Sequence, residues 1–170
     1  GNFRDSGHSV QQTTDGGYII TGQITNQPSQ HTQSSENVGL IKTNSQGDEE
    51  WSKYFGGNHY DGGKSVQQTT DGGFIITGTV EENGCDKVLL LKTDISGNLT
   101  WAKTISSSFC EDIGYFVQQT TDGGYIITGD IWLANEDTKM WLIKTDMNGD
   151  TLWTRQFGNP YGNGKSVRQT

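Results

Sequence analysis

One repeated pattern constrains this chain more than any other feature. A segment reading Ser-Val-Gln-Gln-Thr-Thr-Asp-Gly-Gly-Tyr-Ile-Ile-Thr-Gly begins at Ser9, and it recurs with few changes from Ser65 and from Phe116. A fourth copy begins at Ser166 and runs to Thr170. The valines of successive copies lie 56, 51 and 50 residues apart. Repeats of this length are typical of solenoids and propellers, in which a unit buries its apolar faces by stacking on a neighbour.

Each unit is predicted to form four short strands. In the first unit they cover Val10–Thr13, Tyr18–Ile24, Val38–Thr43 and Glu50–Phe55, each bounded by Gly, Asp or Asn. The Asp-Gly-Gly between the first two strands indicates a hairpin, because glycine supplies the positive φ that tight turns require. An Asn or Asp side chain closes a second turn between the third and fourth strands. We therefore expect an all-β fold of four-stranded antiparallel meanders.

A tryptophan on the fourth strand of each unit indicates how the units pack. These residues are Trp51, Trp101 and Trp153. A large aromatic side chain on one face of an outer strand suits packing on the next sheet, and four-stranded units of about 50 residues stacked around an axis describe a β-propeller. The expected blades cover residues 9–57, 65–108 and 116–158, and 166–170 would be the first strand of a next blade.

The motif x-G-x-S-V-x-x-T-x-D-G-G-Y/F-I-I-T-G, followed by L-I-K-T-D-x-x-G-x-x-x-W-x-K/R-x-F-G-G, resembles the blade repeats of the SBBP-type and quinoprotein-like (PQQ-like) β-propeller superfamily. Such blades are common in long surface proteins of bacteria and archaea. The resemblance covers essentially the whole chain. It implies a propeller architecture rather than one activity, because these blades are scaffolds for unrelated functions. Quinoprotein enzymes of the family typically have adjacent cysteines and an acidic metal-binding set, and this chain has no Cys-Cys pair.

The lengths of the connections divide each unit into constant and variable parts. The two hairpins keep the same length in all three units, whereas the loop between the second and third strands and the crossing to the next unit vary. In a meander these two variable connections emerge at the same end, opposite the hairpins. Loops on a rigid scaffold usually carry binding, so the variable end is the predicted functional face.

The variable connections are rich in amide, carboxylate and aromatic side chains, which suit a glycan, a cation or a polar protein surface. The expected loops are Thr25–Asn37, Glu81–Asp86 and Trp132–Lys139 within units, and Gly57–Lys64, Ser107–Tyr115 and Gly158–Lys165 between them. The candidate ligand-binding residues are His59, Tyr60, Asp61, Glu111, Asp112, Trp132, Asn135, Glu136 and Asp137. The plain alternative is that these are solvated loops without a ligand.

No catalytic, metal or cofactor site is predicted. Asp146-x-Asn148-x-Asp150 has the oxygen spacing of a calcium loop, but the required Gly and Glu positions are missing, so a turn is the better interpretation. The three histidines are dispersed, and no nucleophile elbow or Cys–His pair occurs. An acidic residue recurs five positions before the first three repeat valines, at Asp5, Asp61 and Asp112, whereas the fourth equivalent position is Gly162. We interpret these residues as closing the glycine-rich crossings rather than as a carboxylate ring.

Charge excludes some partners. The net charge is −8, which disfavours nucleic acid, and no apolar run approaches the roughly 20 residues of a membrane span. Six of the 12 basic residues occupy two repeat-equivalent positions, and we expect their alkyl chains to pack beside aromatic rings while their charges reach water. These residues are Lys42, Lys92, Lys144, Lys53, Lys103 and Arg155.

Cys85 and Cys110 are the only cysteines. Both are predicted in variable connections that leave the same end of adjoining strands, so we expect a disulfide bond rather than two free thiols. A disulfide favours an extracellular or cell-surface location, or the periplasm.

These observations together predict a non-enzymatic extracellular or cell-surface β-propeller module for adhesion, assembly or binding of a glycan or protein ligand. The alternative is part of a quinoprotein-like enzyme or a periplasmic scaffold. Three blades do not easily close a ring. We therefore expect either further blades of the same chain or self-association to complete a ring of 6–8 blades.

Overall fold

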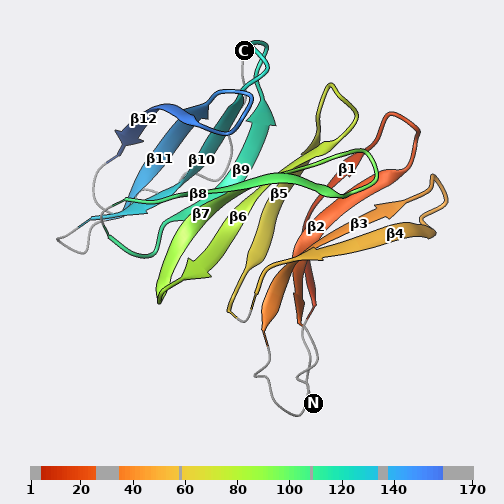
Figure 1. The fold of residues 1–170 in the computed structure, drawn as a ribbon, viewed down its shortest axis with the longest axis horizontal. Coiled ribbons are helices and arrows are strands. Elements are labelled where there is room, and N and C mark those ends of the chain that lie inside the picture. The colour runs from red at the N-terminus through yellow and green to blue at the C-terminus, as the bar shows by residue number, and fades with distance from the viewer. Residues whose placement is uncertain (1–4, 26–34, 58, 108, 134–137, 159–170) are drawn as a thin grey trace.

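The computed structural model describes residues 5–25, 35–57, 59–107, 109–133 and 138–158, and every regular element in these ranges is a β-strand (Figure 1). The first unit contains β1 Ser6–Gln12, β2 Tyr18–Thr25, β3 Glu36–Thr43 and β4 Glu49–Phe55. The second contains β5 Gly62–Gln68, β6 Phe74–Glu82, β7 Cys85–Thr93 and β8 Leu99–Ile105. The third contains β9 Ile113–Gln119, β10 Tyr125–Trp132, β11 Thr138–Thr145 and β12 Thr151–Phe157. Among the described residues there is no helix that could cross a membrane.

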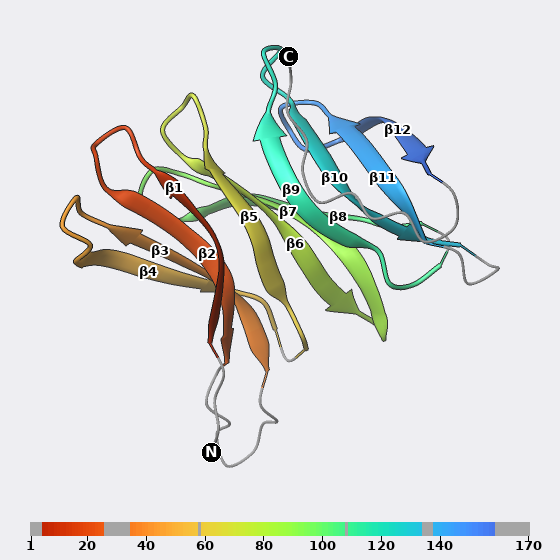
Figure 2. The ribbon, with the colours of Figure 1, turned by 180° about the vertical axis from the view of Figure 1, so that it is seen from behind.

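Each unit is one antiparallel sheet whose four strands lie in chain order. The predicted all-β fold of four-stranded meanders is therefore confirmed. The three sheets follow one another in space, and the first strands β1, β5 and β9 run side by side (Figures 1 and 2). Within the described ranges the sheets do not close into a ring.

The predicted hairpins form as the sequence indicates. In the first unit, Gly16 has a φ of 86°, and the Asp15 carboxylate accepts hydrogen bonds from the Thr13 hydroxyl and the Gly17 amide. The turn between β3 and β4 is closed by Asn44, whose Oδ1 accepts the amides of Gln46 and Asp48 at 2.9 Å each. The Asp146 turn has the same bonds to Asn148 and Asp150. The oxygens of this sequence therefore close a turn, as predicted.

The lysine that precedes each third-strand threonine does not reach water, which corrects the sequence-based expectation for Lys42, Lys92 and Lys144. Their ammonium groups are buried and lie 2.9 Å from the aspartate of the Asp-Gly-Gly turn of the same unit. Each also donates to the carbonyl of the following threonine at 2.8 Å. The physical reason is that burial is tolerated where a full set of charged and backbone acceptors surrounds the cation. Each ion pair therefore ties the first hairpin to the third strand.

Each sheet has two apolar faces, and the core lies between sheets rather than within them. We call the face directed toward the following unit the front, and the face directed toward the preceding unit the back. One core cluster joins the front of unit 1 to the back of unit 2, and a second joins the front of unit 2 to the back of unit 3. The first contains Ile19, Val38, Leu40, Val66, Phe74, Ile76, Leu89 and Leu91. The second contains Ile75, Val88, Leu90, Val117, Tyr125, Ile127, Ile131, Trp141 and Ile143.

The repeat tryptophan packs on the following sheet, as predicted. The ring centroid of Trp51 lies 5.9 Å from that of Phe74, and that of Trp101 lies 5.9 Å from that of Tyr125. Gly97 and Gly149 of the next unit lie against these two indole rings, and a Cβ on Gly149 would lie 2.7 Å from Trp101. The lysine two residues after each tryptophan also reaches the next unit. Lys53 donates to Asn98 at 3.3 Å, and Lys103 pairs with Asp150 at 2.8 Å.

The Gln-Gln pair of the repeat links neighbouring first strands. Gln11 Oε1 accepts the backbone amide of Gln68 at 2.7 Å, and Gln68 Oε1 accepts the amide of Thr14 at 2.9 Å. The same reciprocal bonds join Gln67, Gln119 and Thr70 one unit further along. Because β1 and β5 belong to different sheets, these side chains replace the ladder bonds that the strands do not make with each other.

We predict that Gly149→Ala destabilises the fold more than Gly123→Ala. Both glycines have positive φ, 80° and 84°, so each substitution incurs a left-handed backbone cost of about 1–2 kcal/mol. A Cβ on Gly123 meets nothing within 4 Å, whereas one on Gly149 meets the Trp101 ring and should cost about a further 1–3 kcal/mol. Urea denaturation measures both. Equal losses would show that the tryptophan contact between units contributes little.

We predict a loss of stability below pH 4 that depends on the hairpin aspartates. The pKa of Asp15 and of Asp122 is lowered well below 3.8, mainly by the threonine hydroxyl and the lysine ammonium. A carboxyl group with a lowered pKa in the folded state stabilises the fold above about pH 4, and this contribution is lost as the pH falls toward the folded-state pKa.

The test compares the free energy of unfolding of the native chain and of the Asp15→Asn, Asp122→Asn double variant between pH 7 and pH 2. Burial raises the pKa of Asp112, so the contribution of this residue to stability changes with pH in the opposite direction. Asp112 is present in both proteins and therefore does not alter the difference between them. The difference between the proteins should therefore shrink as the pH falls. A difference that is independent of pH would contradict the assignment.

Candidate binding site at the variable-loop end

The disulfide bond Cys85–Cys110 marks the end of the molecule where the variable connections meet. It joins the start of β7 to the crossing between β8 and β9, and the two Cα atoms lie 4.7 Å apart. Nearby, Tyr60 of the first crossing pairs with Glu36 at the start of β3. The predicted disulfide is thus confirmed. In units 1 and 2 the within-unit connection and the crossing lie at the same end, as expected.

The β6–β7 connection is shorter than the predicted loop Glu81–Asp86. β6 continues to Glu82 and β7 starts at Cys85, so Cys85 is a strand residue. The two turn residues Asn83 and Gly84 have φ values of 56° and 76°. Asn-Gly is the sequence that a two-residue type I′ hairpin favours, and this signal was available in the sequence.

The predicted loop Trp132–Lys139 is also shorter in the structure. Trp132 is the last residue of β10, and β11 begins at Thr138. The Trp132 side chain is half-buried. Three further candidates, Asn135, Glu136 and Asp137, lie outside the described residues, as do most of the loop 25–37 and of the crossing 158–165.

The crossings are closed by buried aspartates. The two oxygens of Asp61 accept the amides of Gly57, at the end of unit 1, and of Glu81, in unit 2, at 3.0 and 3.1 Å. The Asp61 amide in turn donates to the Glu36 carbonyl at 2.8 Å. Asp61 therefore connects the two sheets through three backbone bonds.

Asp112 has the same role at the second crossing. Its carboxylate accepts the amides of Ser107 and Trp132 and the Ser107 hydroxyl. Asp5 Oδ1 accepts the Thr25 amide at 3.0 Å in the first unit. The interpretation of these residues as closing the crossings agrees with this geometry. Because Asp61 and Asp112 are fully engaged and almost completely buried, they hold the loops rather than present a carboxylate at the surface.

Acidic side chains gather around the disulfide. Burial raises the pKa of Asp86, and the negative charges of Glu81, Glu111 and Asp61 raise it further. The amides of Glu111 and Asp112 both donate to the Asp86 carbonyl, at 3.2 and 3.1 Å, which fixes the crossing against β7. Glu111 has a φ of 80°, so the chain turns sharply beside Cys110. The loop end of unit 2 therefore carries a concentrated negative charge.

Exposed aromatic and histidine side chains border this acidic region. Tyr60 and Phe109 are both exposed, and His59 Nδ1 lies 3.4 Å from Glu81 Oε1. His59, Tyr60 and Glu111 were expected here from the sequence, and the structure places them in the two neighbouring crossings. Phe109 was not singled out, although it lies within the predicted crossing Ser107–Tyr115.

A pocket of about 320 Å³ opens between units 1 and 2 near the same end. Its apolar wall includes Phe55, Val80 and Leu89, and the acidic residues Asp61 and Glu82 also line it. Sequence reasoning missed this pocket because its walls belong to strands of two different units. In the next interface the position of Leu89 is taken by the larger Trp141, which belongs to the core cluster there.

The described residues contain no group of three or more His, Cys, Asp or Glu side chains arranged to hold a metal ion. The loop end offers carboxylates, a phenol, an imidazole and a phenyl ring. Neither the models of known protein families nor the curated proteins match this chain.

We predict that loss of the disulfide lowers the free energy of unfolding by about 3 kcal/mol, because the bond closes a segment with a sequence separation of 25 residues. The Cys85→Ser, Cys110→Ser double variant, measured by urea denaturation, should show this loss. Reducing agent should destabilise the native protein by a similar amount and leave the variant unchanged. Two reactive thiols per unreduced, unfolded chain would contradict the bond.

Proposed function

We propose that the chain is a β-propeller segment that acts as a non-enzymatic binding or adhesion module, with the variable-loop end as its ligand face. The observation that carries this proposal is the grouping of variable connections, exposed aromatic residues and carboxylates at one end of three stacked sheets. The opposite end consists of constant hairpins closed by their own side chains. A scaffold with one constant and one variable end is the usual design of a binding protein.

The propeller arrangement is supported by the way in which the sheets stack. Successive four-stranded antiparallel sheets pack face to face through the same tryptophan contact, and their first strands run side by side (Figure 2). If this contact is repeated, each sheet is rotated relative to the preceding one about an axis that runs alongside the first strands. Propellers are built in this way from 4–8 sheets.

The charge of the loop end favours a ligand with positive or hydrogen-bond-donating groups. Glu81, Asp86 and Glu111 crowd together, and the Lys87 charge is paired with Glu82 at 2.7 Å. The whole chain has a net charge of −8. A basic protein surface or a glycan with many hydroxyl groups would donate hydrogen bonds to these carboxylates. Tyr60 and Phe109 offer rings on which sugars or apolar side chains can stack.

The disulfide supports an extracellular or cell-surface location, because such bonds persist in oxidising compartments. It also suits a binding face. The bond holds two loops together that carry like charges, so the negative surface remains fixed before a ligand arrives. A preorganised face loses less conformational entropy on binding.

We predict that the purified protein binds members of a panel of immobilised glycans and basic proteins through its loop end. The paired variants Tyr60→Ala and Phe109→Ala should weaken binding about 10-fold or more, since aromatic residues dominate such contacts. Ile95→Ala and Met147→Ala are matched controls, because these side chains are also exposed and apolar but lie in the constant turns. Surface plasmon resonance at two salt concentrations gives both affinities and the charge dependence.

Equal losses in the loop variants and the turn controls would contradict the assignment of the loop end. Absence of binding across the whole panel would contradict the binding proposal. A visible absorption band from a bound quinone in the purified native protein would instead favour the quinoprotein-like enzyme.

A further inference from the structure

The two outermost sheet faces are the separated halves of an interface that the chain already forms twice. The front of unit 3 repeats the residues that the fronts of units 1 and 2 bury, and the back of unit 1 repeats those that the backs of units 2 and 3 bury. The front of unit 3 carries Ile126, Met140, Leu142, Trp153 and Phe157. The back of unit 1 carries Val10, Tyr18, Ile20 and Ile41.

Exposure distinguishes these faces from their internal equivalents. Val10 is 63% exposed, whereas Val66 and Val117 at the same repeat position are 5% and 1% exposed. On the other outer face, Trp153 is 39% and Phe157 48% exposed. Ile126 on the outer front is only 7% exposed, so the exposed apolar surface there is formed by Trp153 and Phe157. Exposed apolar patches of this kind mark interaction surfaces.

We propose that a second copy of this chain covers these faces, and that the front of unit 3 of each copy docks on the back of unit 1 of the other. Two copies then make two identical head-to-tail contacts and form a closed assembly of six sheets. This association goes beyond ligand binding at the loop end and does not depend on it.

Both partners of the aromatic contact at the internal interfaces are also present on the two outer faces. Internally, Trp101 packs on Tyr125 and lies against Gly149. The corresponding partners for Trp153 in a second copy are Tyr18 and Gly47. A Cβ on Gly47 would meet nothing within 4 Å, so the space that the indole occupies in the internal interfaces is open at this turn.

The charged contact is complementary as well. Lys103 reaches across the internal interface to Asp150 at 2.8 Å. Arg155 takes the place of this lysine on the outer front, and Asp48 takes the place of the aspartate on the outer back. Within one copy the Arg155 guanidinium lies 5.6 Å from the centre of the Trp153 ring, so these two side chains lie next to each other on the front of unit 3. An interface between two identical front faces would supply Arg155 from both sides and would lack Asp48.

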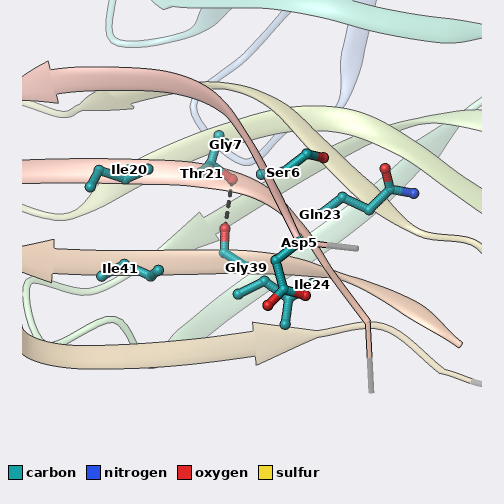
Figure 3. A pocket seen from close by; sticks show the side chains of 10 residues that line it. Asp5, Ser6, Gly7, Ile20, Thr21, Gln23, Ile24, Gly39 and Ile41 are labelled. Atoms are coloured by element: carbon teal, nitrogen blue, oxygen red, sulfur yellow. Dashed lines mark hydrogen bonds between the residues drawn. The ribbon is translucent and has the colours of Figure 1, made fainter. Parts of the chain in front are cut away.

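The sizes of the facing side chains also match. Phe55 and Leu89 line the same pocket at the first interface, and Ile105 packs in the cluster that contains Trp141 at the second. A large residue thus meets a smaller one each time. On the outer back the third-strand position is Gly39, which is covered by the Ile24 side chain, and a hollow of about 140 Å³ lined by Ile20, Ile24 and Ile41 lies beside it (Figure 3). Phe157 is the large residue of the outer front that this hollow accommodates.

Geometry sets the number of copies. A head-to-tail contact forms a ring when its rotation closes and a filament when it does not. Two copies supply six sheets, which lies within the 4–8 of closed propellers. Closure at two copies leaves no apolar face exposed, and this favours a dimer over a longer assembly.

Sedimentation equilibrium of the full chain tests the proposal, with a mass of twice 18.7 kDa expected. The front variant Trp153→Asp and the back variant Val10→Asp should each weaken the association by about 100-fold, because each buries an unpaired carboxylate at the interface. Ile95→Asp is the control. Ile95 is an exposed apolar residue in the β7–β8 turn of the middle unit, whose two faces are both covered within the chain, so this variant should dimerise normally.

Mixing the two defective variants gives the sharpest result. The intact front of Val10→Asp fits the intact back of Trp153→Asp, so the mixture should form a dimer with one contact at concentrations where each variant alone is monomeric. A chain shortened to end at Gly158 should also dimerise, because the contact uses only β1–β4 and β9–β12. Far-UV circular dichroism confirms that each variant is folded.

The proposal is overturned if the native chain is a well-folded monomer at high micromolar concentration, or if it forms assemblies larger than the dimer. It is also overturned if Val10→Asp leaves the dimer intact, since the contact would then join two identical fronts. Loss of association in the shortened chain would assign the contact to residues 159–170 instead.

Discussion

The fold depends on apolar sheet faces that a single unit cannot bury. Each sheet has apolar residues on both sides, so alternation along its strands does not separate a wet face from a dry one. Stacking buries these faces at two interfaces, so each core cluster contains residues of two units. This explains why a chain with only 30% hydrophobic residues has well-packed sheets: most of its buried hydrophobic side chains lie at the two shared interfaces. The middle unit, which is covered on both faces, contains more fully buried residues than its neighbours.

Polar side chains hold the parts that the apolar core does not reach. The buried lysines fasten the first hairpin to the third strand, the glutamines join first strands of adjacent sheets, and the aspartates close the crossings. All three act on backbone groups or on residues far away in the sequence. Because these buried lysines and aspartates each have a partner, the desolvation penalty is offset, and removal of one partner would leave the other uncompensated. The repeat therefore keeps these polar residues together as a set.

The parts of the fold that depend on local sequence could be predicted. Glycine at positive φ fixes the hairpins, strand alternation orients Trp51 and Trp101, and the equal hairpin lengths define the constant end. Burial of Lys92 could not be derived from residue type, because lysine is usually exposed. Its partner Asp71 lies in another hairpin, and only the joint recurrence of lysine and aspartate in three units could have indicated the pair. The pocket beside Phe55 was missed for a similar reason, since it depends on how two sheets face each other.

The division between ends follows from the same packing. At the hairpin end each turn is closed by its own side chains, and the β7–β8 and β11–β12 turns lie against a tryptophan of the preceding unit, so a change in their length would disturb the interface. At the other end the connections leave the sheets beyond the shared core, and Asp61 and Asp112 close them mainly through bonds to backbone amides. A connection held at its base in this way can change its length and composition without loss of the core. The negative charge around Asp86 is an example: it opposes folding locally, and the disulfide and the aspartate bonds beside it keep the charged groups in place. Carboxylates that repel one another in the free protein gain most from a ligand that supplies positive charge, so a ligand of the kind we propose would offset the cost of holding these charges together.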